Sequence, residues 1–237
     1  MSDITLITGA GGALGSEVSR VLAARGHKLV LCDGPQATAR LEALSLELGE
    51  GIATTSAQDF SRREAYVQAL EGARNTLGGP VSRACLVAGG WQGGKPFHEA
   101  DPSVWDAMMT QNVETVRRAF EVLLPPMVAE KRGSVVVVGS RAAVRPWTSA
   151  NAAAYATSKA AVVTLMEVVA QELLEDGVRV NAILPSTMDT RANRAAMPDS
   201  DPLRWVSLAS AAGVIAFLLS DEARDISGAA IPVYGRS

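Results

Sequence analysis

The sequence has few of the features that direct a chain to a membrane or to nucleic acid. Its 237 residues contain no basic run longer than a dipeptide, and the net charge is −3, so we expect no nucleic-acid partner. No apolar segment approaches the roughly 20 residues that span a bilayer. Asp3 interrupts the first apolar run, so no secretory signal is expected. We therefore expect a cytoplasmic protein that has no membrane partner.

Cysteine and histidine are also scarce, with two of each. Cys32 and Cys85 both lie in apolar, strand-like runs. In that setting a reduced core thiol is expected rather than a disulfide or a metal ligand. His27 and His98 are expected at the surface, and the sequence predicts no metal site.

The pattern that is present is a regular alternation of apolar strand segments with helical segments. Hydrophobic residues make up 48% and charged residues 20% of the chain, which is typical of a globular protein. No linker interrupts the chain, so we expect one α/β domain covering residues 1–237 with a doubly wound parallel sheet of about seven strands and helices on both faces. The predicted strands are residues 4–8, 29–32, 52–55, 84–88, 135–138, 178–184 and 230–234.

A glycine-rich turn, residues 8–15, follows the first predicted strand and opens a helix. Glycines at such a turn let backbone N–H groups approach a pyrophosphate, whose charge the helix N-terminus favours. Asp33 ends the second strand, where a carboxylate can accept hydrogen bonds from the adenosine ribose and would repel a 2′-phosphate. The turn therefore predicts dinucleotide binding, with NAD(H) preferred over NADP(H). Arg40, on the next helix, is interpreted as a solvated surface charge.

Tyr155 and Lys159 are four residues apart in a predicted helix and therefore share one face. A phenol has a pKa of about 10, and lowering it to about 7 requires roughly 4 kcal/mol of stabilisation of the phenolate. An exposed ion pair supplies only about 0 to 1 kcal/mol. The pair can therefore transfer protons at neutral pH only in a partly desolvated pocket, with a second positive charge nearby such as an oxidised nicotinamide ring.

The order and spacing of these motifs resemble the short-chain dehydrogenase/reductase family over essentially the whole chain, which implies a Rossmann-type fold and hydride transfer. The resemblance implies that Tyr155 exchanges a proton with the substrate oxygen and that Lys159 binds the nicotinamide ribose and lowers the tyrosine pKa. It also implies that Ser140 orients the substrate carbonyl and that Asn112, at a helix bend, holds a water that relays protons. The motifs that carry it are residues 8–15, Asp59, Asn112, Ser140, Tyr155 with Lys159, residues 181–185 and residues 227–235.

The same resemblance implies a cofactor site and a homo-dimer or homo-tetramer. Asp59 would contact the adenine, Ala88 and Gly89 the adenosine ribose, and Thr190 the nicotinamide carboxamide. The complete set of expected cofactor-binding residues is Gly9, Gly11, Gly12, Ala13, Leu14, Gly15, Asp33, Asp59, Phe60, Ala88, Gly89, Tyr155, Lys159, Pro185, Thr187, Met188 and Thr190.

Four positions depart from the family pattern. Ala13 replaces the usual middle glycine, residues 86–87 are Leu-Val where Asn-Asn is usual, and Ser186 replaces a common glycine. Residues 87–91 and several residues between 189 and 198 resemble dihydropteridine reductase, an NADH-dependent enzyme that reduces a quinonoid pterin. That enzyme typically lacks the serine that is present here as Ser140, so we rank a carbonyl or alcohol substrate first.

Substrate contacts are expected from loops at the carboxyl ends of the strands, where doubly wound folds bind ligands. Residues 186–205 are polar and have the length of a lid that excludes water. Trp91 can stack on a flat substrate or cover the backbone of its own loop. Three hypotheses follow: an enzyme that interconverts a secondary alcohol and a ketone, a pterin reductase, and a dinucleotide-binding sensor without turnover. The candidate substrate residues are Trp91, Trp147, Asn193, Arg194 and Met197.

Overall fold

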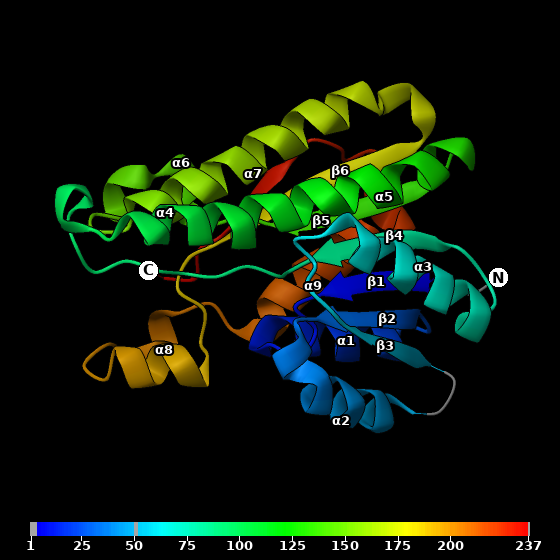
Figure 1. The fold of residues 1–237 in the computed structure, drawn as a ribbon, viewed down its shortest axis with the longest axis horizontal. Helices are drawn as coiled ribbons and strands as arrows, with labels where there is room; N and C mark the ends of the chain where they lie inside the picture. The colour runs from blue at the N-terminus through cyan, green and yellow to red at the C-terminus, as the bar shows by residue number, and fades with distance from the viewer. Residues whose placement is uncertain (1–3, 50–51, 237) are drawn as a thin grey trace.

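A computed structural model describes residues 4–49 and 52–236. Its centre is one seven-stranded parallel sheet in the order β3-β2-β1-β4-β5-β6-β7, which confirms the predicted doubly wound fold (Figure 1). The chain order reverses between β1 and β4, and such a switch point opens a crevice at the carboxyl ends of the strands. The strands are β1 (Ile4–Thr8), β2 (Lys28–Asp33), β3 (Ala53–Ala57), β4 (Val81–Leu86), β5 (Gly133–Val138), β6 (Val178–Pro185) and β7 (Ala230–Val233).

Helices cover both faces of the sheet and enclose two apolar cores. One core contains Tyr66, Phe120 and Met166 from α3, α5 and α7, and the other contains Leu22 and Ile215 from α1 and α9. The central strands are apolar on both sides because both of their faces are covered. The α-helices are α1 (Ala13–Ala24), α2 (Thr38–Leu48), α3 (Arg63–Leu77), α4 (Pro102–Met108), α5 (Thr115–Ala129), α6 (Arg141–Val144), α7 (Ala153–Glu172), α8 (Arg191–Ala196) and α9 (Leu208–Leu219).

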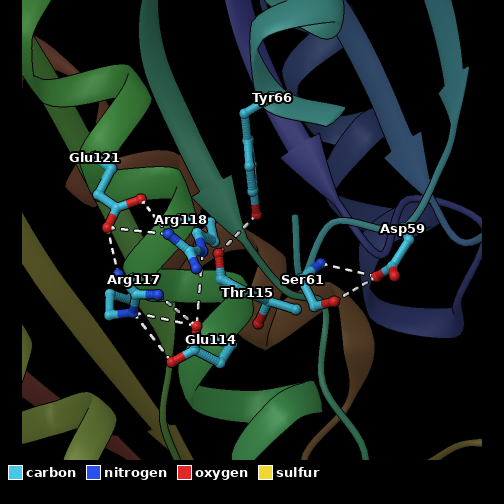
Figure 2. A network of polar contacts seen from close by, with 8 residues as sticks. All are labelled: Asp59, Ser61, Tyr66, Glu114, Thr115, Arg117, Arg118 and Glu121. Carbon is cyan, nitrogen blue, oxygen red and sulfur yellow. Dashed lines mark hydrogen bonds and ion pairs between the residues drawn. The ribbon is translucent and has the colours of Figure 1, made fainter. Parts of the chain in front are cut away.

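The helical segment that carries Asn112 is not uniform. Asp101 caps α4 by accepting a hydrogen bond from the Ser103 N–H at 2.9 Å, as the Asp-Pro pair predicts. A π-helical turn, Met109–Glu114, then joins α4 to α5 and contains Asn112, so the bend implied by the family resemblance is present. The hydroxyl of Tyr66 donates a 2.8 Å hydrogen bond to the Thr115 carbonyl and ties α3 to the start of α5 (Figure 2).

Two local expectations differ from the structure. β4 ends at Leu86 rather than at residue 88 because the Ala88 N–H leaves the strand ladder and donates to Thr8 Oγ1 at 3.1 Å. His27 is half-buried rather than exposed, since its Nδ1 lies 2.8 Å from Thr5 Oγ1. Cys32 and Cys85 are buried free thiols as expected, and burial raises the pKa of both.

Within the described residues, α7 alone has the length and hydropathy of a membrane-crossing helix. This is weak evidence for a span, because the core helix of a globular protein passes the same test. Its buried positions include Met166 and Ala170, which belong to the apolar core under the sheet. We therefore interpret the apolar character of α7 as core packing.

Candidate active site

The glycine turn between β1 and α1 is closely packed against the loop that follows β4. Gly9 has φ +66°, and a Cβ on it would lie 2.9 Å from the Ala88 nitrogen. A Cβ on Gly15 would lie 2.1 Å from the Gly9 carbonyl oxygen. Side chains at these positions would therefore fill the turn. Because both residues are glycines, the backbone N–H groups of the turn stay open to a diphosphate at the positive end of α1. Ala13 begins α1 without disturbing this geometry, and Leu14 is buried beneath it.

Asp33 holds the glycine turn against the end of β2. Its carboxylate accepts hydrogen bonds from the Gly11 N–H at 3.0 Å and from the Gly34 N–H at 2.7 Å. Arg40 is exposed but is not only a solvated charge, because its Nε donates to the Gly11 carbonyl at 3.0 Å. The turn therefore carries an acidic and a basic side chain beside each other, which weakens the charge argument for NAD(H) over NADP(H).

Asp59 and Phe60 serve local packing in this structure. Asp59 accepts hydrogen bonds from the N–H and hydroxyl of Ser61 at 3.0 and 2.6 Å (Figure 2), and these bonds lower the pKa of the carboxyl group. Phe60 is buried and packs edge-to-face on Tyr66 with ring centroids 4.9 Å apart. The roles of both residues toward a cofactor remain predictions.

Ser140 and Tyr155 come together at the carboxyl edge of the sheet. Ser140 follows β5 and caps α6, since its Oγ accepts the Ala142 N–H at 3.1 Å. Tyr155 lies in the first turns of α7. Burial raises the pKa of the Tyr155 phenol, and a side-chain hydrogen bond with Ser140 lowers it. The two hydroxyl groups predicted to act on one oxygen are therefore adjacent.

Lys159 is buried, and its Nζ donates a 2.8 Å hydrogen bond to the Val138 carbonyl. Burial lowers the pKa of this ammonium group to about 8. Among the groups around the Tyr155 phenol, the hydrogen bond with Ser140 is the one that lowers its pKa against the effect of burial. The effect of Lys159 on the phenol pKa remains a prediction.

The buried Lys159 makes a pH-dependent contribution to stability. Its pKa is 10.5 in the unfolded reference and about 8 in the fold, so between these values the unfolded chain binds more protons. The free energy of unfolding should therefore rise as pH increases from about 8 to 10.5, by up to about 3 kcal/mol. Urea denaturation across this range should show the free energy of unfolding of wild type rising relative to that of Lys159→Met, because the buried thiols, whose raised pKa values act in the opposite direction above about pH 9, are present in both proteins. Equal pH dependence in the two proteins would contradict the burial of a titrating ammonium group.

Asn112 and Gly89 bring the loop after β4 against α7. The Asn112 amide accepts from the Gly90 N–H at 2.9 Å and donates to the Gly90 carbonyl at 3.1 Å and to Ser158 Oγ at 2.9 Å. A Cβ on Gly89 would lie 2.5 Å from Asn112 Oδ1 and 3.3 Å from Lys159 Nζ. Sequence reasoning missed Ser158, although its place between Tyr155 and Lys159 was a usable signal.

Residues 186–205 form a loop whose two ends are joined. The Val206 N–H donates to the Thr187 carbonyl at 2.9 Å, and the Asp189 N–H donates to the Val206 carbonyl at 2.8 Å. These bonds place Met188 in a bridge with Val206, directly after Pro185 ends β6. In Figure 1 the loop carries α8 away from the main body.

The expected ligand residues within this loop are engaged locally. Thr190 caps α8 by accepting the Asn193 N–H at 3.1 Å. The Asn193 side chain donates to the Met188 carbonyl at 2.8 Å. Arg194 forms a two-bond ion pair with Asp189 at 2.6 and 2.8 Å. Contacts of these side chains with cofactor or substrate remain predictions.

The remaining substrate candidates are only partly assembled around the site. Trp91 is 63% exposed, and its ring covers its own loop, because a Cβ on Gly93 would lie 3.0 Å from Trp91 Cζ2. This contact favours the backbone-covering interpretation over stacking on substrate. Trp147 is exposed and Met197 is half-buried.

The fold and this site define a dinucleotide-binding protein of the Rossmann type with paired hydroxyl groups at its switch-point edge. The family model described as short chain dehydrogenase matches residues 3–201. The chain belongs to the short-chain dehydrogenase/reductase family of oxidoreductases.

Curated relatives and solved structures are similar along nearly the whole chain. L-xylulose reductase of Bos taurus is 31% identical over 97% of this chain and 94% of its own length. The 2-(S)-hydroxypropyl-CoM dehydrogenase 3 of Xanthobacter autotrophicus is 29% identical, covering 99% and 96%. The structure of 3-ketoacyl-(acyl-carrier-protein) reductase from Brucella melitensis complexed with NADH is 28% identical with a TM-score of 0.87, covering 99% and 98%.

Proposed function

We propose that this protein is an NAD(H)-dependent oxidoreductase that interconverts a secondary alcohol and a ketone. The observation that carries the proposal is the meeting of the buried Ser140 at the end of β5 with Tyr155 on α7, close enough for Ser140 to lower the phenol pKa, together with the buried Lys159. Two neutral hydroxyl donors at one edge suit a carbonyl oxygen on which negative charge develops during reduction. Relatives named as reductases and dehydrogenases of sugars and alcohols support this reaction class.

In this mechanism Ser140 holds and orients the substrate oxygen, and Tyr155 donates a proton to it during reduction or removes one during oxidation. Lys159 supplies a positive charge beneath the phenol and is within one helical turn of it. Asn112 fixes the backbone of Gly90 and, through Ser158, the catalytic helix. We propose that Asn112 also holds the water that reloads the proton.

A nicotinamide dinucleotide would supply the hydride, and the geometry of the glycine turn fits its diphosphate. Gly9 and Gly15 leave the backbone open, and Asp33 stands at the ribose end of β2. We propose a preference for NAD(H), because a 2′-phosphate would approach the Asp33 carboxylate. Arg40 opposes this preference, so the comparison of NADH with NADPH binding is its direct test.

We further propose that residues 186–205 act as a lid and that the protein works as a cytoplasmic homo-dimer or homo-tetramer. α8 has no buried residue, so the lid can move without disrupting a core. Closure over the substrate would exclude water from hydride transfer.

The second candidate function is reduction of a quinonoid pterin, and it is favoured by the resemblance of residues 87–91 to dihydropteridine reductase. The contact of Trp91 with Gly93 argues against it, since the ring is engaged with its own loop rather than presented to a flat ligand. A dinucleotide sensor without turnover would have no need of a half-buried Tyr155 beside a buried Ser140.

Turnover assays on wild type and Ser140→Ala separate these functions. With NADH and a panel of ketones, diketones, sugars and quinonoid dihydropterin, we expect ketone reduction that falls about 10²- to 10³-fold in Ser140→Ala, because one donor to the developing oxyanion is lost. Turnover of the pterin alone with a harmless Ser140→Ala would establish the second function. Binding of NADH without any turnover would favour the sensor.

A further inference from the structure

Two arginines that the mechanism does not use share one aromatic ring. Arg141 and Arg145 place their guanidinium groups 5.9 and 5.1 Å from the centroid of the Tyr234 ring. Arg141 is the first residue of the short helix α6, and Arg145 is the residue that caps its end. Cation–π attraction to the Tyr234 ring therefore holds the two like-charged guanidinium groups close to each other.

This cation pair lies at the catalytic edge of the sheet. Arg141 directly follows Ser140, and Tyr234 directly follows β7, whose last residue Val233 pairs with Pro185 at the end of β6. Ser186 Oγ donates a 2.7 Å hydrogen bond to the Tyr234 carbonyl. The serine that replaces the common family glycine thus fixes the backbone that carries the ring.

Within residues 4–49 and 52–236, no ion pair joins Arg141 or Arg145 to an acidic side chain. Arg194 of the proposed lid differs from this pair, because an ion pair with Asp189 neutralises its charge. Arg145 is exposed and Arg141 is half-buried, so an anion from solvent can reach both.

The Tyr234 ring holds the cation pair on the β7 side of Ser140, away from the glycine turn. The glycine turn follows β1, which lies four strands from β7 in the sheet order, or roughly 19 Å at about 4.8 Å per strand. Ser140 follows β5, only two strands from β7, or roughly 10 Å. The cation pair is therefore placed for the substrate side of the site.

Resting on the proposed function, we infer that the substrate carries an oxyanion group several bonds from the reacting carbonyl and that Arg141 and Arg145 bind it. Guanidinium groups match carboxylate, sulfonate and phosphate oxygens through paired hydrogen bonds. In this assignment the arginines select the substrate and Tyr234 positions them. Sequence reasoning missed this pair, although two arginines spaced by four directly after Ser140 were visible.

The test measures inhibition of the best neutral ketone by small anions of matched length. Pentanoate and pentane-1-sulfonate are compared with the neutral pentanamide in wild type, Arg145→Gln, Arg145→Lys and Arg141→Gln/Arg145→Gln. We expect the anions to inhibit wild type about 10- to 100-fold more tightly than the amide. The double variant should lose this difference with KM for the neutral ketone unchanged, and Arg145→Lys should keep part of it. Tighter inhibition by pentanoate would identify the substrate's oxyanion group as a carboxylate, and tighter inhibition by pentane-1-sulfonate would identify it as a sulfonate.

Arg224→Gln is the matched control, because Arg224 is exposed beside the amino ends of β5 and β6 and should leave inhibition unchanged. The inference is overturned if the anions and the amide inhibit wild type equally, or if the double variant keeps the preference for anions. Neither result affects the ketone turnover on which the proposed function rests. If no ketone turns over, the proposed function fails separately. Quenching of Trp147 fluorescence by pentanoate then decides the inference, since loss of binding in the double variant supports it and unchanged binding overturns it.

Discussion

Tyr155→Phe is expected to lower kcat by about 10²- to 10⁴-fold, the range that a positioned general acid contributes. The substitution removes the only atom of Tyr155 that can exchange a proton with the substrate oxygen. The ring still fills the same buried space beside Ser140, so the fold and NADH binding should be retained. Steady-state kinetics with the best ketone and a fluorescence titration with NADH measure the two properties separately.

Tyr66→Phe is the matched control for this experiment. Tyr66 is fully buried, and its hydroxyl donates to the Thr115 carbonyl at the start of α5 (Figure 2) rather than to Ser140 or Tyr155. Its loss should cost about 1 kcal/mol of stability and leave kcat close to wild type. Turnover by Tyr155→Phe at the wild-type rate would show that another group transfers the proton.

Gly15→Ala is expected to abolish dinucleotide binding and to destabilise the fold. The new Cβ would lie 2.1 Å from the Gly9 carbonyl oxygen and 2.8 Å from the Ala10 Cα. These are backbone atoms, so relief requires movement of the turn rather than rotation of a side chain. We expect a stability loss of at least about 1–3 kcal/mol, together with loss of the NADH fluorescence signal.

Gly72→Ala provides the comparison for the glycine variant. Gly72 lies within α3, and a Cβ there would meet no atom within 4 Å. Alanine should stabilise the helix by about 0.5–1 kcal/mol and leave NADH affinity unchanged. Thermal denaturation and the same titration measure both variants, and normal NADH affinity in Gly15→Ala would refute the close-packed turn as the diphosphate site.

The architecture was largely predictable because apolar periodicity reports burial directly. The alternation of strands and helices predicted the parallel sheet, and the Asp101-Pro102 pair predicted the start of α4. The end of β4 was placed two residues too late because Ala88 is apolar. The alanine nevertheless turns its N–H to Thr8, and such a change of hydrogen-bond partner leaves no trace in hydropathy.

The sequence indicated which side chains gather at the candidate site, but not which atoms they contact. Spacing places Tyr155 and Lys159 on one helical face, but the Val138 carbonyl that binds the ammonium group is on another element. Likewise, the meeting of Arg145 with Tyr234 joins positions 89 residues apart in the numbering. Contacts of this kind depend on both the strand order and the side-chain rotamers. Neither can be predicted from local patterns in a single sequence.

The joined base of residues 186–205 has a consequence for how this protein can diversify. Backbone bonds among Thr187, Asp189 and Val206 close the loop at its base, and Arg204 is bonded to Arg236 beyond β7. Residues 190–203 therefore form a cassette that is attached to the main body at its two ends. If residues 186–205 act as the proposed lid, exchange of that cassette would change the substrate range while the glycine turn and Tyr155 stay in place.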